Sequence, residues 1–486
     1  MRRRESSVGG MDVGAAQFPE MLPRLEELVL GCDFVGLDME FTGLHSDSQH
    51  SLFDLPAEWY RKGRQCVQQF TVNQLGELFW FLKYRYIAHS YNFFLFPATF
   101  GQMDSEFSCQ TSSIQFLSHY DFDYNKFLKD GIPYMNETQE KKLQHLLSGN
   151  WMVQSFDKDK VKKVIDQVTC WISSAEEEDS MVLHDIYGFQ VIELQLILRK
   201  AFPDIWTIPL KDEKLMVKKM NPQYRWDLEN TAFDPCQREQ ILYSARGFTN
   251  IFQTLPLVGH NMLMDLLYLH EKFYKPLPEN YEEFKDNIHF LFPVLLDTKN
   301  ITKATWKEFQ FPQVSYLLEL YETLCSIVKP TDQLCPEIFH SDDSLRYGTH
   351  QTAAPTFSQY IDVLTAYVNQ VNLIRGAIQK INFSGADDLT TRPPLLLATV
   401  RGWRGATEEQ IHQELRSFCR FDVRRLRKNH IRIVMKVYKT HPNLKISVYH
   451  HWKHSPRVTS FLQICGIVAS WSLLAFLLGG SYSCRV

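Results

Sequence analysis

An apolar run at residues 33–41, DFVGLDMEF, includes Asp38 and Glu40, two acids placed two positions apart. The run predicts a β-strand, and because alternate side chains of a strand share one face, Asp38 and Glu40 should project together. Residues 66–72 and 86–96 are rich in β-branched and aromatic residues and predict further strands. The paired acids are therefore expected on one face of a sheet.

Helical spacing is typical of the next part of the chain. Apolar residues recur at intervals of three and four over 136–150 and 161–172, and residues 188–202 predict an amphipathic helix. The polar stretch 210–240 predicts a surface loop or linker. A strand and turn at 255–261 and a helix at 262–274 are expected to follow, so the pattern predicts an α/β fold.

Residues 393–445 have a separate pattern. A strand (393–400), a helix (407–418) and a strand (430–438) are predicted, and Thr407 has Glu409 or Gln410 near its cap position. This order predicts a small RNA-recognition-like α+β region at 390–450. The glycine-and-aromatic strand signature of that module is absent, so its usual stacking platform is not expected.

A basic stretch lies inside this region. Seven positive charges fall between Arg416 and Arg432, interleaved with Phe418 and Phe421. Such a stretch suits contacts with RNA phosphates. The alternatives are a solvated face, or charge held near an anionic membrane surface.

The two ends of the chain differ in character. Residues 1–20 lack the apolar stretch of a secretory signal and predict a disordered extension. Residues 461–480 are apolar, and twenty helical residues span roughly 30 Å, the thickness of a bilayer core. We expect a transmembrane tail anchor with the rest of the chain facing the cytosol. A buried C-terminal core helix is the alternative.

Composition narrows the class of protein. A length of 486 residues predicts two or three domains, and 44% hydrophobic residues exclude a disordered or collagen-like chain. The net charge of −4 means that a nucleic-acid partner must bind to local basic patches. None of the 10 cysteines forms a Cys-x-x-Cys pair, so neither a zinc ribbon nor a disulfide framework is supported. A reducing compartment is favoured.

The Asp38–Glu40 pair suits divalent metal. Mg²⁺ takes carboxylate oxygens, and two ions roughly 3.5–4 Å apart can clamp both the attacking and the leaving oxygen of a phosphodiester. A two-ion site needs about four carboxylates to balance its charge. An Asp-x-Glu triplet alone is weak evidence for such a site.

Several segments together resemble one family. They are FVGLDMEFTGL (34–44), CQTSSIQFLSHYDFDYNKFLKDGIPYMN (109–136), LVGHNMLMDLLYLH (257–270), FPVLLDTK (292–299), NQVNLI (369–374) and INFSG (381–385). In this order they resemble the poly(A)-specific ribonuclease family, most closely its membrane-anchored branch, which trims piRNA precursors.

The resemblance implies an RNase H-like DEDD exonuclease core, a mixed sheet flanked by helices, at 21–154 and 241–385. An inserted R3H-like small α/β domain is implied at 155–240, although the Arg-x-x-x-His signature is absent there. The implied reaction is hydrolysis from the RNA 3′ end, releasing 5′-mononucleotides, with two Mg²⁺ ions.

The resemblance also assigns roles to individual residues, one motif at a time. Asp38 and Glu40 match the first-strand metal ligands and Asp265 matches the third acid, with Asp38 bridging both ions. Phe41 and Leu44 match positions that pack the terminal nucleotide. The resemblance implies that His260 and Asn261 shape a turn and that Asp297 is structural.

One motif of the family is missing. The fourth acid should lie in a His-Glu-Ala-x-Tyr-Asp segment after Asp297, but no histidine between 298 and 380 is followed five residues later by an aspartate. His340 leads to Leu345 and His350 leads to Pro355. We interpret the chain as an alternatively spliced product or an incomplete gene model that lacks this segment. Asp342, Asp343 or Asp362 would have to supply the missing carboxylate.

The missing motif leaves two alternative functions. The first is a Mg²⁺-dependent 3′-to-5′ exoribonuclease acting on small single-stranded RNA, and the second is a catalytically impaired, membrane-tethered RNA-binding or scaffold protein. The resemblance implies a Tudor-domain scaffold and a PIWI protein as partners and leaves a homodimer open. The expected location is the mitochondrial outer membrane or the endoplasmic reticulum.

Overall fold

The computed structural model divides into two compact units. The first comprises residues 1–48, 60–372 and 382–385, and the second comprises residues 49–59, 373–381 and 386–486. The structure describes residues 11–44, 49–82, 86–98, 105–147, 158–184, 190–210, 214–230, 233–251, 256–309, 320, 323, 338–340, 357–391, 395–400, 407–415, 421–427, 430–435, 444–450 and 460.

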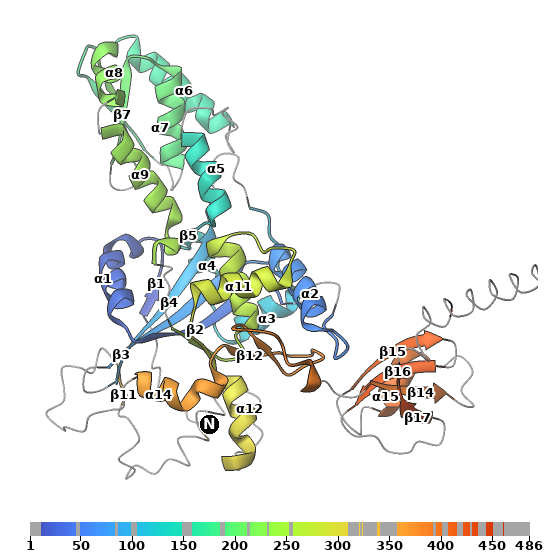
Figure 1. Cartoon of the computed structure of the whole chain (residues 1–486). Coiled ribbons are helices and arrows are strands. Elements are labelled where there is room, and N and C mark those ends of the chain that lie inside the picture. The colour runs from blue at the N-terminus through green and yellow to red at the C-terminus, as the bar shows by residue number, and fades with distance from the viewer. Residues whose placement is uncertain are drawn as a thin grey trace, which may run out of the picture. The chain divides into compact units, whose positions relative to one another are not determined.

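A mixed sheet forms the centre of the first unit (Figure 1). Its strands are β1 (Met11–Val13), β2 (Phe34–Phe41), β3 (Val72–Leu82), β4 (Tyr86–Pro97), β5 (Ile132–Tyr134), β9 (Leu257–Gly259), β10 (Leu295–Asp297), β11 (Ile338–His340) and β12 (Gln370–Asn372). The order is β1-β4-β3-β2-β9-β10-β12, with β5 and β11 also paired to β4. β3 is antiparallel to β2 and β4, whereas β9 and β10 are parallel to their neighbours. The predicted mixed α/β fold is confirmed.

Helices flank this sheet. They are α1 (Phe18–Gly31), α2 (Pro56–Gln69, which begins in the second unit), α3 (Thr111–His119), α4 (Tyr124–Lys129), α5 (Glu137–Leu147), α10 (Leu263–Leu269), α11 (Tyr281–Leu291), α12 (Thr298–Phe309) and α14 (Phe357–Leu364). Short turns η1 (Phe248–Ile251), η2 (His270–Tyr274, a π-helix) and η4 (Thr365–Tyr367) complete the set. Aromatic residues join the layers: Phe93 of β4 lies 6.4 Å from Phe18 of α1 and 5.0 Å from Phe248 of η1, between ring centroids.

The N-terminal expectation is wrong for residues 11–20. Residues 1–10 lie outside the described part of the chain, but Met11–Val13 form β1, parallel to β4, and α1 begins at Phe18. Val13 and Phe18 are buried. Gly14 approaches Asp130 so closely that a Cβ atom there would lie 1.9 Å from a carboxylate oxygen. These residues are held by contacts with partners far along the sequence, which is why the local sequence pattern did not predict their structure.

Two local predictions are also wrong. Residues 66–69 form the end of α2, not a strand, because Trp59, Tyr60, Cys66 and Val67 bury one helical face. Residues 210–240 are not a linker. They contain β8 (Lys214–Lys219), α8 (Pro222–Asn230) and part of α9 (Phe233–Arg246).

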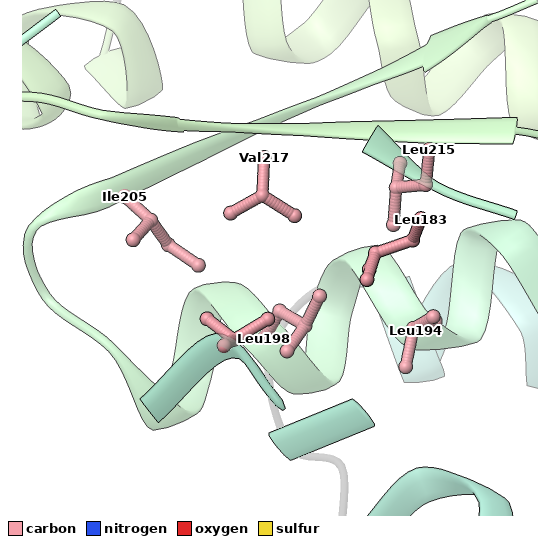
Figure 2. Close-up of a cluster of buried hydrophobic side chains, with 7 residues drawn as sticks. Leu183, Leu194, Leu198, Ile205, Leu215 and Val217 are labelled. Atoms are coloured by element: carbon pink, nitrogen blue, oxygen red, sulfur yellow. The ribbon is translucent and has the colours of Figure 1, made fainter. Parts of the chain in front are cut away.

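The region where an inserted domain is implied has its own sheet and core. It contains α6 (Lys158–Ile172), β6 (Ser180–Leu183), α7 (Gln190–Ala201), β7 (Ile205–Leu210), β8 and α8, and the sheet order is β6-β8-β7, all antiparallel. Figure 2 shows strand residues such as Leu215 and Val217 facing Leu194 and Leu198 of α7 across one buried cluster. The region thus has an α/β structure with its own hydrophobic core. Its R3H-like identity and its limits at 155–240 stay a prediction.

The second unit contains a four-stranded antiparallel sheet (Figure 1). The strands of this sheet are β14 (Leu395–Val400), β15 (Phe421–Arg427), β16 (His430–Met435) and β17 (Leu444–Val448). The unit also contains α15 (Glu408–Leu415), η5 (Leu389–Thr391) and the start of β13 (Lys380–Asn382), which ends in the first unit. The sheet order is β15-β16-β14-β17, and Thr407 and Gln410 exchange cap hydrogen bonds of 3.0 and 3.1 Å at the start of α15. Part of the basic stretch forms a strand, β15, that the sequence pattern did not predict.

The predicted tail anchor, residues 461–480, lies outside the described residues. Within the part of the chain that the structure describes, no helix has the length and apolar character needed to span a bilayer.

Candidate active site

β2 carries the first two candidate acids on one face. Val35, Leu37, Met39 and Phe41 are buried on the opposite face, as the alternation of a strand requires. In the antiparallel pair with β3, Asp38 is opposite Gly76 and Glu40 is opposite Gln74. Gly76 has no side chain, and a Cβ atom there would lie 3.6 Å from the Asp38 carbonyl oxygen and 3.7 Å from Asn92 Oδ1. The predicted orientation of the two acids is confirmed.

β9 and α10 bring the third acid to the same corner. β9 pairs with β2 in parallel as far as Leu37 opposite Gly259, so the chain leaves the sheet beside Asp38. It turns at Asn261, which has a φ of 63°, and enters α10 at Leu263. Asp265 therefore lies in the first turn of α10, and it is buried.

The three carboxyl groups act on one another. Burial raises the pKa of Asp265 well above its usual range, and the charges of Asp38, Asp297 and Glu40 raise it further. Burial and then the charge of Asp38 raise the pKa of Glu40 to about 7. Partial desolvation raises the pKa of Asp38, although the residue as a whole is exposed. A cation at this corner would relieve the repulsion.

Asp38, Glu40 and Asp265 all offer carboxylate oxygens, which are the ligands that a hard divalent cation such as Mg²⁺ prefers. Among the described residues, no group of three or more Asp, Glu, His or Cys side chains is gathered closely enough to hold a metal ion. Asp362 is exposed on α14 and is not among the charges that shift the pKa of Asp265. Asp342 and Asp343 lie outside the described residues. No fourth acid is therefore identified.

Asp297 organises the turn that precedes α10. Its Oδ1 accepts hydrogen bonds from the backbone N–H groups of Asn261 and Lys299, both at 2.9 Å, and its Oδ2 accepts one from Asn372 at 2.9 Å. The carboxylate is fully buried and ties together the segments after β9, β10 and β12. These contacts support the structural role implied for Asp297.

His260 and Asn261 take part in this turn. The Thr298 hydroxyl donates to the Gly259 carbonyl at 3.0 Å, so it accepts from Nδ1 of His260 at 2.9 Å. Burial lowers the pKa of His260. The Asn261 side-chain oxygen accepts from the Asn372 amide at 2.5 Å. Both residues are thus engaged in holding the turn.

The two expected nucleotide-packing residues lie in different surroundings. Phe41 is 8% exposed, and its ring stacks on Tyr268 with centroids 4.0 Å apart and planes at 16°. Leu44 is 41% exposed. Leu44 is therefore accessible to a ligand, whereas Phe41 is buried and packs the end of β2 against Tyr268.

A groove of about 430 Å³ opens beside Glu40. It is lined by Asp12, Glu40, Gln74, Phe94, Phe116, Leu117, Tyr120, Asp121, Phe122 and Asp123. Phe116 and Tyr120 are 55% and 68% exposed, with ring centroids 4.9 Å apart. Sequence reasoning missed these aromatic residues, although their spacing of four on a short helix was the available signal.

Comparison with known proteins identifies the family of the chain. The family model for the CAF1 family ribonucleases matches residues 13–388. Poly(A)-specific ribonuclease PNLDC1 of Mus musculus is 52% identical, with 96% of this chain and 99% of that protein covered. The Homo sapiens PNLDC1 is also 52% identical, covering 92% and 97%. The pre-piRNA 3′-exonuclease trimmer of Bombyx mori is 27% identical, covering 95% and 96%. The chain belongs to the CAF1 family of ribonucleases, 3′-to-5′ exoribonucleases of the DEDD class.

Proposed function

We propose that this chain shortens small single-stranded RNAs, specifically piRNA precursors, from their 3′ ends and releases 5′-mononucleotides. One observation carries the proposal: β2 and α10 bring Asp38, Glu40 and Asp265 to one corner of the sheet, where their charges act on one another. The name of the Bombyx mori relative, a pre-piRNA trimmer, supports the class of substrate.

We propose that Asp38, Glu40 and Asp265 would hold two Mg²⁺ ions, which would have to draw these carboxylates closer together than they lie in this structure. Such ions, when bound, supply positive charge that stabilises the transition state of phosphodiester hydrolysis. The residues of the chain itself position this chemistry. The Asp297 carboxylate fixes the turn before α10 and thereby the place of Asp265.

The groove beside Glu40 is the proposed path of the RNA 3′ segment. The exposed rings of Phe116 and Tyr120 suit base stacking, which is worth about 1–3 kcal/mol per base in single-strand binding. Leu44, with Phe41 beneath the same segment, is the proposed packing surface for the terminal nucleotide.

The missing fourth acid supports a second candidate, a catalytically impaired RNA-binding or scaffold protein. The alignment with the Mus musculus relative extends over 528 positions, more than the 486 residues of this chain, so the relative has residues without a counterpart here. This difference supports the proposed loss of a segment by splicing or in the gene model. Either protein would be tethered by residues 461–480 to the mitochondrial outer membrane or the endoplasmic reticulum. A Tudor-domain scaffold, a PIWI protein and a second copy of the chain are the proposed partners.

The test is an exonuclease assay with the full chain and a 5′-labelled single-stranded RNA. We expect a ladder of 3′-shortened products that requires Mg²⁺, disappears in EDTA and is lost in Asp38→Ala. Retained RNA binding without a ladder would favour the impaired protein. A ladder that persists in Asp38→Ala would refute the proposed site.

A further inference from the structure

The segment that follows the paired acids, residues 41–44, is held by contacts from several elements. The Thr42 N–H donates to the Thr71 carbonyl, and the Thr71 N–H donates to the Thr42 hydroxyl, both at 2.9 Å. Gln110, just before α3, donates its N–H to the Thr42 carbonyl at 2.7 Å and accepts from the Leu44 N–H at 3.1 Å. The segment is therefore fixed along one side by the residues that directly precede β3 and α3.

Tyr268 holds the other side. Its ring stacks on Phe41 at 4.0 Å, and its hydroxyl donates to the Gly43 carbonyl at 2.9 Å. Tyr268 is fully buried. Gly43 lies directly over Phe70, where a Cβ atom would be 2.4 Å from the ring, so the segment has little room to shift. The Tyr268 hydroxyl thus fixes the carbonyl immediately before Leu44.

The same helix carries Asp265. Asp265 and Tyr268 are three positions apart on α10, so they lie on neighbouring parts of one helical face. A shift of α10 would move the third acid and the support of residues 41–44 together. The helix therefore sets the spacing between the acidic corner and the exposed side chain of Leu44.

We propose that Tyr268 is a positioning residue that holds residues 41–44 in register with Asp265, so that the RNA 3′-terminal nucleotide packs on Leu44 within reach of the acids. This inference rests on the proposed function for its ligand, a nucleotide with a free 3′ hydroxyl. The contacts of Tyr268 with Phe41 and Gly43 do not depend on it.

Tyr268→Phe tests the proposal, because it removes only the hydroxyl and keeps the ring. Tyr60→Phe is the matched control. Tyr60 is 2% exposed, its hydroxyl donates to the Pro278 carbonyl at 2.6 Å, and its ring stacks on Phe284 with centroids 4.9 Å apart. Each variant of the full chain loses one buried hydroxyl-to-carbonyl hydrogen bond, and Tyr268→Phe also loses the contact of its hydroxyl with the Cys66 thiol, so we expect a small decrease in Tm for both variants.

Two measurements separate positioning from simple stability. Hydrogen exchange followed by mass spectrometry should show faster exchange in the peptide covering 41–44 for Tyr268→Phe and not for Tyr60→Phe. Anisotropy with a 5′-labelled single-stranded RNA, ending in a 3′ hydroxyl or a 3′ phosphate, should show that Tyr268→Phe reduces the preference for the hydroxyl by about two- to tenfold.

The results distinguish this inference from the proposed function. Equal exchange at 41–44 in both variants would overturn the positioning role of Tyr268. So would an unchanged 3′-end preference in Tyr268→Phe. A wild-type chain that binds both RNA ends equally would instead refute the proposed 3′-end recognition and the ligand assigned to residues 41–44.

Discussion

The charge of Asp38 raises the pKa of Asp265, although the whole inserted region separates the two residues in sequence. The register of β2 against β9 produces this relationship, because β9 ends at Gly259 opposite Leu37 and the chain then turns into α10, while β2 continues through Asp38. Like charges held together without a counterion destabilise the fold, and they are an arrangement expected of a site that binds cations.

Asp265→Asn should therefore separate stability from activity. Asparagine cannot take up the charge that burial and the neighbouring acids disfavour at this position, so we expect Tm to stay the same or rise. Exonuclease activity should fall by more than about a hundredfold, because even outer-shell changes at metal sites cost about 10–100-fold. Asp286→Asn, at an exposed position of α11, is the control. Equal activity in the two variants would contradict the assignment of Asp265.

Divalent cations should stabilise the wild-type chain. Binding only to the folded state adds about 2.7 kcal/mol at a concentration 100 times Kd, and this gain appears as a rise in Tm with Mg²⁺ or Mn²⁺. We expect a smaller rise in Asp265→Asn, measured by differential scanning fluorimetry. An identical rise in both proteins would place the bound cation elsewhere.

Asp297→Ala should be strongly destabilising. It leaves the backbone N–H groups of Asn261, Lys299 and Asn372 without their acceptor in a buried place, and each such loss costs about 1–3 kcal/mol. We expect a decrease of about 3 kcal/mol or more in the free energy of unfolding, measured by urea titration. Asp286→Ala should change it by less than about 0.5 kcal/mol. A mild effect of Asp297→Ala would mean that other acceptors replace the carboxylate.

Glu77 should make stability depend on pH. Burial raises its pKa to about 8, and its Oε2 has no hydrogen-bond partner. The unfolded chain releases this proton near pH 4.5, whereas the folded chain keeps it to about pH 8. The free energy of unfolding is thus least affected by Glu77 below pH 4.5, and it falls as pH rises to 8, by up to about 5 kcal/mol. Melting curves of Glu77→Gln should show a smaller decrease from pH 5 to 8, whereas the exposed Glu20→Gln should match wild type.

Leu198→Ala tests the core drawn in Figure 2. Leu198 is fully buried between α7 and the β6-β8-β7 sheet. Removing a buried leucine side chain costs about 2–5 kcal/mol. We expect faster hydrogen exchange in peptides of 158–219, and little change for Val182→Ala, which is 36% exposed. Protection that is unchanged by Leu198→Ala would show that this cluster does not hold the region together.

The spacing of Asp38 and Glu40 was enough to predict their shared face, because strand alternation is a local property. Asp265 required the family resemblance, since β9 is only three residues long and its pairing with β2 leaves no local signal. The order of residues 11–20 could not be predicted from local sequence either, because it depends on distant partners such as Asp130 and Tyr91.

The aromatic groove was beyond the sequence pattern for a different reason. Phe116 and Tyr120 look like core residues by composition, but Phe116 on α3 and Tyr120 directly after it are exposed, while Leu117 is buried. Which side of so short a helix meets solvent depends on tertiary contacts that the pattern of α3 does not contain. The four neighbouring aromatic residues of the groove come from β4, α3 and the loop between α3 and α4.

Asp297 ties β9, β10 and β12 to one another through the backbone N–H groups of residues 261 and 372, which lie on either side of residues 340–350, the interval that contains the two histidines tested for the missing motif. The order of these strands is therefore secured by an anchor outside that interval. On the proposed splicing origin of this chain, the lost segment removes a carboxylate of the site without removing the hydrogen bonds that hold these three strands together.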